Sequence, residues 1–230
     1  MTDSALLTRL SRLNSGVVAD VLDECGYPHQ ALSSAIRPLR PDMRLAGRAM
    51  CFSGETIASD RDGDAALSSC DIDERLGPGV VGVIATNGHH ASAVLGRLMS
   101  LRFAKLGCAG IVTDGGARDA SGIAQVGLPA FARYVTPLRS KGRWQLTDAD
   151  ATVDVAGQTV EYVTVRSGDY VIGDEDGVMV IPSEIGPQVI EWAEELVRID
   201  ARIVAALDAG DSRDKAFASH PRYAHIRRLR

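Results

Sequence analysis

Two short polar segments carry the residue types that bind ligands or move protons. Their sequences are Asn87-Gly88-His89-His90 and Asp114-Gly115-Gly116-Ala117-Arg118-Asp119. A guanidinium such as that of Arg118 can hold a carboxylate or another oxyanion in a two-pronged fork. The Asp119 carboxylate suits a hard divalent cation or proton transfer, and His89 or His90 would contact substrate or act as an acid near neutral pH. Two plainer interpretations stay open: a surface Arg–Asp ion pair, and loop histidines that make structural hydrogen bonds.

The residues around these segments predict a strand–helix–strand unit. Val80–Ala85 is a nearly continuous apolar run rich in β-branched residues, which is typical of a strand buried on both faces. Ala91–Leu106 carries apolar residues on one helical face, and Gly107 suits a C-terminal cap. Ala109–Thr113 is a second apolar strand. A β-α-β unit of this kind favours parallel pairing of its two strands.

The predicted unit would bring both polar segments to one edge of a sheet. The carboxyl ends of parallel strands meet at that edge, where ligands tend to bind. The start of the helix adds unpaired amide groups and the positive end of a dipole, which suit a carboxylate or a phosphate. Gly115 and Gly116 allow the backbone to turn and to approach a ligand closely. We therefore expect a site for an anionic ligand here.

The same core resembles a known protein family. The segment LGRLMSLRFAKLGCAGIVTDGGARD, followed by GLPAFARYVTP, is similar to the RraA-like family, which includes 4-hydroxy-4-methyl-2-oxoglutarate aldolases and related oxaloacetate decarboxylases. The segments SGVVADVLDECG and IRPLRPDMRLAGRAMCF resemble the opening part of that family, and GDYVIGDEDGVMVIP resembles its closing part. The resemblance covers most of the chain.

The resemblance implies an α/β fold: one domain over residues 1–230, layered β/β/α in the swivelling manner, with N- and C-terminal helices outside. It also implies ring-shaped homotrimers, sometimes paired to hexamers, with sites between subunits. Residues 183–230 would then be a helix and tail that serve as an oligomerisation arm, although a frayed tail is the alternative.

The activity that the resemblance implies is that of a divalent-metal-dependent lyase. An aldolase or decarboxylase of this kind acts on a small anionic 2-oxo acid through a pyruvate enolate, with Mg²⁺ or Mn²⁺ as a Lewis acid. By resemblance, Arg118 would bind the keto oxygen or the carboxylate, and Asp119 would hold the metal. The backbone amides that would cradle the carboxylate belong to Gly96, Arg97, Leu98 and Met99.

Two positions depart from the pattern of the family's lyases. Arg97 stands where an acid usually follows the glycine, and Gly122 stands where a second acid is common. The first acid would orient a metal-bound water or move a proton, and a guanidinium does neither at ordinary pH. The proton role would then fall to His89, His90 or a group from another subunit.

These departures keep an alternative function open. The scaffold would then have lost or redirected its chemistry, either as another small-molecule enzyme or as a non-catalytic protein-binding regulator of the RraA type. A redirected site would accept a more anionic substrate, with Arg97 paired to its extra carboxylate.

Composition excludes other classes of protein. The chain has 230 residues, a formal net charge of −5 and 45% hydrophobic residues. The negative charge argues against a nucleic-acid binder driven by phosphate contacts, and the sequence predicts no membrane span or secretory signal. Four cysteines without a C-x-x-C pair favour a reduced, cytoplasmic protein. The Asp60–Asp64 segment begins like a calcium loop but has its glycine in the wrong place, so we expect a solvated loop.

The rest of the chain predicts further elements by its apolar periodicity. Expected helices are Ser4–Leu13, Ser15–Glu24 and Glu184–Ala209, and expected strands are Leu45–Phe52, Leu128–Tyr134, Ala151–Val155, Thr159–Val165, Tyr170–Ile172 and Val178–Ile181. The basic loop Arg139–Arg143 is either a surface turn or a rim that attracts an anionic substrate. The three acids at 174–176 are expected to be solvated, with a supporting role near the site as the alternative.

Overall fold

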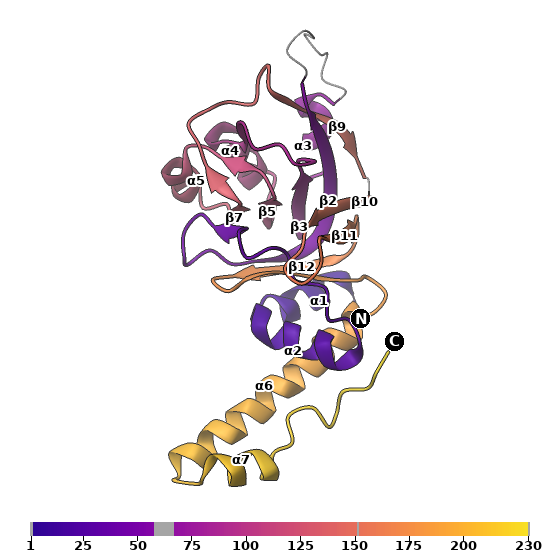
Figure 1. Ribbon diagram of the computed structural model, residues 1–230, viewed down its shortest axis with the longest axis vertical. Helices are drawn as coiled ribbons and strands as arrows, with labels where there is room; N and C mark the ends of the chain where they lie inside the picture. The colour runs from indigo at the N-terminus through magenta and orange to yellow at the C-terminus, as the bar shows by residue number, and fades with distance from the viewer. Residues whose placement is uncertain (1, 58–66, 151, 230) are drawn as a thin grey trace.

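A computed structural model describes residues 2–57, 67–150 and 152–229 (Figure 1). The Asp60–Asp64 segment lies outside the described residues. Within the described ranges, no helix combines the length and the apolar character that crossing a membrane requires.

The main sheet has the strand order β1-β7-β5-β3-β2-β12-β13, and β9 also pairs with β2. Neighbouring strands are parallel from β7 through β5 and β3 to β2, and antiparallel elsewhere. The strands are β1 (Arg37–Pro38), β2 (Leu45–Thr56), β3 (Val80–Ala85), β5 (Gly110–Thr113), β7 (Ala130–Ala132), β9 (Trp144–Ala149), β12 (Tyr170–Asp174) and β13 (Gly177–Ile181).

Two smaller sheets and the helices surround the main sheet. A parallel three-stranded sheet contains β4 (Ala93–Leu95), β6 (Gly116–Ala117) and β8 (Tyr134–Val135), and a separate hairpin contains β10 (Thr152–Ala156) and β11 (Tyr162–Arg166). The helices are α1 (Asp3–Leu10), α2 (Ser15–Cys25), α3 (Ser69–Asp73), α4 (Arg97–Lys105), α5 (Ala120–Val126), α6 (Gly186–Asp208) and α7 (Arg213–Ser219).

The alternation of side chains along β3 explains the layers. Val81 and Val83 point to one face, where they join a core with Val155 and Val165 of the hairpin. Ile84 points to the other face and joins a core that includes side chains of α4 and α5. Because successive strand residues face opposite sides, the sheet lies between a β layer and an α layer. The predicted α/β class and β/β/α layering are therefore confirmed.

The terminal helices cover a different part of the sheet, as predicted. Helices α1, α2 and α6 pack on β12 and β13 through a third core that contains Leu22, Tyr170 and Leu196, and Figure 1 shows this helical part below the sheets. The C-terminal tail runs back along these helices, where Arg222 donates hydrogen bonds to both Asp20 and Asp200. Asp20 is thus an ion-pair partner that ties the tail to α2.

The predicted helix over Ala91–Leu106 is wrong at its start. Residues Ala93–Leu95 form strand β4, and α4 begins only at Arg97. The apolar side chains of this segment are buried, and its backbone pairs with β6. Strand pairing in the fold therefore decides the structure here, although the spacing of the apolar residues also fits a helix. The short elements α3, α5, α7 and β9 were not predicted, since each is too short or too polar to show a clear period.

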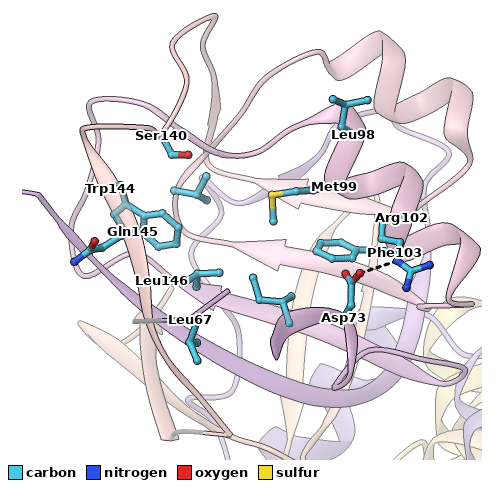
Figure 2. Close-up of a pocket in the computed structure, with 12 residues that line it drawn as sticks. Leu67, Asp73, Leu98, Met99, Arg102, Phe103, Ser140, Trp144, Gln145 and Leu146 are labelled. Carbon is cyan, nitrogen blue, oxygen red and sulfur yellow. Dashed lines mark hydrogen bonds and ion pairs between the residues drawn. The ribbon is translucent and has the colours of Figure 1, made fainter. Parts of the chain in front are cut away.

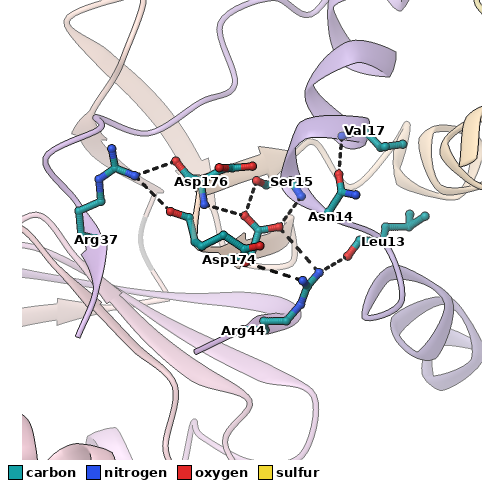
Figure 3. Close-up of polar contacts among 9 residues, drawn as sticks. Leu13, Asn14, Ser15, Val17, Arg37, Arg44, Asp174 and Asp176 are labelled. Atoms are coloured by element: carbon teal, nitrogen blue, oxygen red, sulfur yellow. Dashed lines mark hydrogen bonds and ion pairs between the residues drawn. The ribbon is translucent and has the colours of Figure 1, made fainter. Parts of the chain in front are cut away.

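The acids of the β12–β13 turn do not share one environment. Glu175 and Asp176 are exposed, as predicted, whereas the Asp174 side chain is only 1% exposed. The Asp174 carboxylate accepts hydrogen bonds from Ser15 N at 2.7 Å, Ser15 Oγ at 2.6 Å and Asp176 N at 3.1 Å (Figure 3). Arg44 lies 3.8 Å away. The prediction of a solvated acid is wrong for Asp174, which joins the start of α2 to the turn.

Candidate functional site

The small parallel sheet brings the start of α4 next to the Arg118–Asp119 pair. Strand β4 leads into Gly96 and α4, and strand β6 leads into Arg118, Asp119 and α5. Because β4 and β6 are parallel neighbours, with Leu95 opposite Ala117, the residues that follow them lie side by side. The Arg118 amide donates a hydrogen bond to Leu95 O at 2.9 Å, which fixes this register.

Gly96 lies directly against the Arg–Asp pair. A Cβ atom built on Gly96 would come within 3.2 Å of Arg118 Nε and 3.8 Å of Asp119 Oδ2. A side chain here would therefore occupy the space in front of both groups. Gly96 also precedes the first turn of α4, whose start no side chain caps. The amides of Arg97, Leu98 and Met99 are those that a helix leaves without internal partners, and they suit an anion.

Arg118 and Asp119 form only a loose pair. Arg118 Nε lies 3.9 Å from Asp119 Oδ2, and the two side chains are 41% and 53% exposed. Asp119 has φ 59° and ψ 39°, a left-handed conformation that aspartate tolerates better than most residues but that still costs energy. This conformation turns the chain from β6 into α5 and keeps the carboxylate next to Gly96.

A small cavity of about 100 Å³ opens at this point. Its lining residues are Ala93, Val94, Leu95, Gly96, Leu98, Met99, Arg118, Arg139 and Ser140. Two arginines and a helix start therefore face one space. The basic loop thus contributes to the rim, which favours the second of the two interpretations of Arg139–Arg143. The cavity has the charge and donors to bind a small carboxylate.

A divalent cation would find one protein carboxylate here, that of Asp119. Across residues 2–57, 67–150 and 152–229, no group of three or more His, Cys, Asp or Glu side chains is placed to hold a metal. Zinc sites usually need three or four such ligands, whereas Mg²⁺ often binds through one or two carboxylates, several waters and the substrate. A half-exposed Asp119 beside an anion cradle fits Mg²⁺ or Mn²⁺ bound in that manner.

The two histidines have different environments, and neither lines the cavity. His89 is 4% exposed, and both ring nitrogens are engaged: Nδ1 lies 2.9 Å from Thr56 Oγ1 and Nε2 lies 2.8 Å from Ser92 Oγ. Burial lowers the pKa of His89. These contacts favour the structural interpretation for His89. His90 is exposed, with Nδ1 3.1 Å from Gly88 O.

The environment of His89 predicts a pH effect on stability. Because its pKa is lower in the folded protein than the usual value of 6.5, the unfolded chain binds the extra proton more readily, so stability falls as pH drops below that value. Denaturant unfolding at pH 7.5 and 5.5 should therefore show a larger loss in wild type than in His89→Gln. Equal losses of stability in both proteins would contradict a lowered pKa of His89 in the folded protein.

Asp114, the first acid of the second polar segment, is structural. Its Oδ1 accepts hydrogen bonds from Thr86 N and Thr86 Oγ1, both at 2.8 Å. Burial raises the pKa of Asp114. The side chain ties the end of β5 to the end of β3 and does not line the cavity.

The two positions that depart from the family pattern contact each other. A Cβ atom on Gly122 would come within 2.5 Å of Arg97 Cδ and 3.2 Å of Arg97 Cγ. The Arg97 side chain therefore crosses from α4 onto α5 at Gly122, and it does not line the cavity. A side chain at position 122 would displace the exposed side chain of Arg97, so the two departures are neighbours in the fold. Arg97 contributes only its backbone amide to the cradle.

A second, larger cavity adjoins the first (Figure 2). It has a volume of about 470 Å³ and mainly apolar walls from α3, α4 and β9. The sequence pattern does not predict this cavity, because its walls come from segments far apart in the chain and one of them, β9, has no clear strand pattern.

Comparisons with known proteins agree with this architecture. A family model described as RraA-like, Aldolase/RraA, matches residues 16–180. Protein DlpA of Legionella pneumophila is 26% identical over 92% of this chain, which spans only 33% of the DlpA length. A Paraburkholderia phytofirmans protein named "Putative 4-hydroxy-4-methyl-2-oxoglutarate aldolase" is 32% identical over 72% of this chain and 96% of its own. The crystal structure of Streptomyces coelicolor RraAS2, a member of the RNase ES inhibitor RraA family, superposes with a TM-score of 0.75 at 26% identity, over 87% of this chain and 97% of its own.

Proposed function

Because this chain belongs to the RraA-like family, we propose that it is a divalent-metal-dependent lyase that cleaves a carbon–carbon bond in a small anionic 2-oxo acid. One observation carries the proposal: Gly96, the start of α4 and Arg118 line one small cavity, and the Asp119 carboxylate lies beside Gly96 at its edge. Oxaloacetate and 4-hydroxy-4-methyl-2-oxoglutarate are substrates of the required class.

The residues of the site have separate roles in this proposal. The amides at the start of α4 hold the substrate carboxylate. The guanidinium of Arg118 lies against the keto oxygen and stabilises the negative charge that develops there as the bond breaks. Mg²⁺ or Mn²⁺, held by Asp119, would supply Lewis-acid polarisation of the same keto group. Gly96 keeps the space in front of these groups open.

Decarboxylation and aldol cleavage require different proton transfers. In decarboxylation the bond to the departing CO₂ breaks, its electron pair gives a pyruvate enolate, and the enolate takes a proton from solvent. Aldol cleavage also needs a group that removes the proton of the C4 hydroxyl. Two candidates for this group are His90, which is exposed in the loop after β3 but does not line the cavity, and a group from another subunit. His89 is less suited, since its hydrogen bonds occupy both of its ring nitrogens.

Metal binding can be tested without turnover. Mn²⁺ titrations followed by electron paramagnetic resonance, with and without pyruvate, should show tighter Mn²⁺ binding when pyruvate is present. We expect Asp119→Asn to weaken Mn²⁺ binding at least tenfold, because the one carboxylate of the site is lost. Asp208→Asn, at an exposed position in α6, is the matched control. Wild-type Mn²⁺ affinity in Asp119→Asn would overturn the assignment.

The contact between Arg97 and Gly122 favours a second candidate, a protein-binding regulator without catalysis. Both positions lack the acids of the family's lyases, and similar structures include an RNA-processing inhibitor RraA. A regulator would turn over no 2-oxo acid and would bind its protein partner equally well in EDTA. Activity gained only in Arg97→Asp would point to a lyase scaffold whose chemistry has been switched off.

A further inference from the structure

The larger cavity has no role in the function proposed above, although it lies beside the cradle. Its lining residues are Leu67, Ile72, Asp73, Val94, Leu98, Met99, Arg102, Phe103, Ser140, Trp144, Gln145 and Leu146. Figure 2 shows these side chains around one space, with α4 on one side and β9 on the other. A volume of about 470 Å³ lies within the range of small-molecule sites.

The two cavities share part of their walls. Val94, Leu98, Met99 and Ser140 line both. Leu98 lies in the first turn of α4, so its amide belongs to the cradle while its side chain borders the apolar space. Leu98 is 75% exposed, so its side chain is accessible to an apolar group of a ligand. A carboxylate held at the start of α4 would thus place the rest of its molecule beside the apolar walls.

The charged residues of the larger cavity neutralise each other. Arg102 Nε lies 2.7 Å from Asp73 Oδ2, and Figure 2 shows this pair at one end of the space. Among the described walls of the larger cavity, a second carboxylate on the substrate would therefore meet no uncompensated cation, since Arg139 lines the smaller cavity. Apolar groups gain free energy when such walls remove them from water.

We infer that the larger cavity binds an apolar alkyl or aryl group at the far end of the 2-oxo acid, so that the substrate is a 4-hydroxy-2-oxo acid with an apolar substituent at C4. This inference rests on the function proposed above. In the cleavage the C3–C4 bond breaks and its electron pair stays on C3 as the pyruvate enolate. The C4 hydroxyl loses its proton to the base, C4 becomes the carbonyl of an apolar aldehyde or ketone, and the enolate takes up a proton.

Continuity with the cradle favours the substrate over other occupants. The cavity and the cradle share four wall residues and therefore form one recess, which a molecule bound at the start of α4 can extend into. A second copy of the chain that filled the space would leave no room for an apolar tail, so 2-oxo acids would bind without preference for it. The affinities of different tails therefore decide between the two occupants.

Calorimetric titrations in Mg²⁺ compare three ligands with the same 2-oxo acid head: pyruvate, 2-oxoglutarate and 4-methyl-2-oxopentanoate. We expect 4-methyl-2-oxopentanoate to bind at least tenfold more tightly than pyruvate, since each buried methylene strengthens binding about fourfold. 2-Oxoglutarate, with a charged tail, should gain no such advantage. Equal binding of pyruvate and 4-methyl-2-oxopentanoate would overturn the inference and leave the proposed function intact. Failure of all three to bind would overturn both.

Substitutions in the walls of the larger cavity that lie away from the cradle test whether the apolar tail binds there. Leu67→Gln changes a half-buried wall residue, and Leu146→Phe fills part of the space. We expect each to lower the ratio of the two affinities at least threefold, with folding checked by thermal unfolding. Val197→Gln, at an exposed apolar position of α6, should keep the wild-type ratio. An unchanged ratio in both folded wall variants would place the tail elsewhere and contradict the inference.

Discussion

Replacing Arg118 by lysine is expected to lower kcat/KM for a 2-oxo acid substrate about 100- to 1,000-fold, the usual effect of losing one preorganised charge-stabilising group. Arg118 is fixed by the hydrogen bond from its amide to Leu95 O, and its guanidinium lies in front of Gly96. Lysine keeps the charge but lacks the fork geometry that matches a carboxylate or keto oxygen. Steady-state kinetics of pyruvate release measure the effect.

Because the Arg118 side chain is half-exposed, its replacement is expected to change catalysis without changing stability. Within the part of the chain that the structure describes, its ion pair with Asp119 is long at 3.9 Å, so the fold does not depend on that pair. Thermal unfolding should give the wild-type midpoint for Arg118→Lys. Arg133→Lys, an exposed arginine on the neighbouring segment, is the matched control and should keep wild-type kinetics. A kcat/KM for Arg118→Lys within threefold of wild type would contradict the role assigned to the guanidinium.

Replacing Asp174 by alanine is expected to lower the free energy of unfolding by about 3–5 kcal/mol, the range for breaking a buried charged network. The loss would leave Ser15 N, Ser15 Oγ and Asp176 N without their acceptor, and each buried donor left unpaired costs free energy. It would also remove the hydrogen bonds that link the start of α2 to the β12–β13 turn (Figure 3). Equilibrium unfolding in urea measures the change.

Asp176→Ala is the matched control for Asp174. It removes a carboxylate from the same turn, but that side chain is exposed, and the contacts of Asp176 in this network are made by its backbone. Exposed substitutions of this kind usually change the free energy of unfolding by about 0.5 kcal/mol or less. Equal effects of the two substitutions would show that burial of Asp174 does not stabilise the fold.

The pattern of apolar residues predicted those elements in which nearly every residue is buried. Val80–Ala85 forms β3 with the predicted bounds, because a strand buried on both faces has an unbroken apolar sequence. The same pattern misassigned Ala93–Leu95, since three apolar residues before a helix fit either structure. Pairing with β6 decides between them, and β6 itself, Gly116–Ala117, carries no strand signal.

The site was predictable where its residues are adjacent in the sequence. Arg118 and Asp119 stand together after a predicted strand, so the topology placed them at the edge of the sheet. Gly96 lay inside the predicted helix, and only the resemblance to the family assigned it to the site; the structure starts α4 directly after it. His89 was not predictable in the same way, because its partners Thr56 and Ser92 meet it only in the fold. The apolar cavity depends equally on contacts between distant segments, above all β9 with α4.

Pyruvate release with and without a divalent ion tests the central claim most directly. Wild type and Asp119→Asn would be given oxaloacetate and 4-hydroxy-4-methyl-2-oxoglutarate in Mg²⁺ or Mn²⁺ and in EDTA, each beside a protein-free blank with the same ion. We predict wild-type release well above the blank, lost in EDTA, restored by added Mg²⁺, and lowered at least 100-fold in Asp119→Asn. Release by wild type that persists in EDTA, or that Asp119→Asn retains, would contradict a metal-dependent lyase at this site.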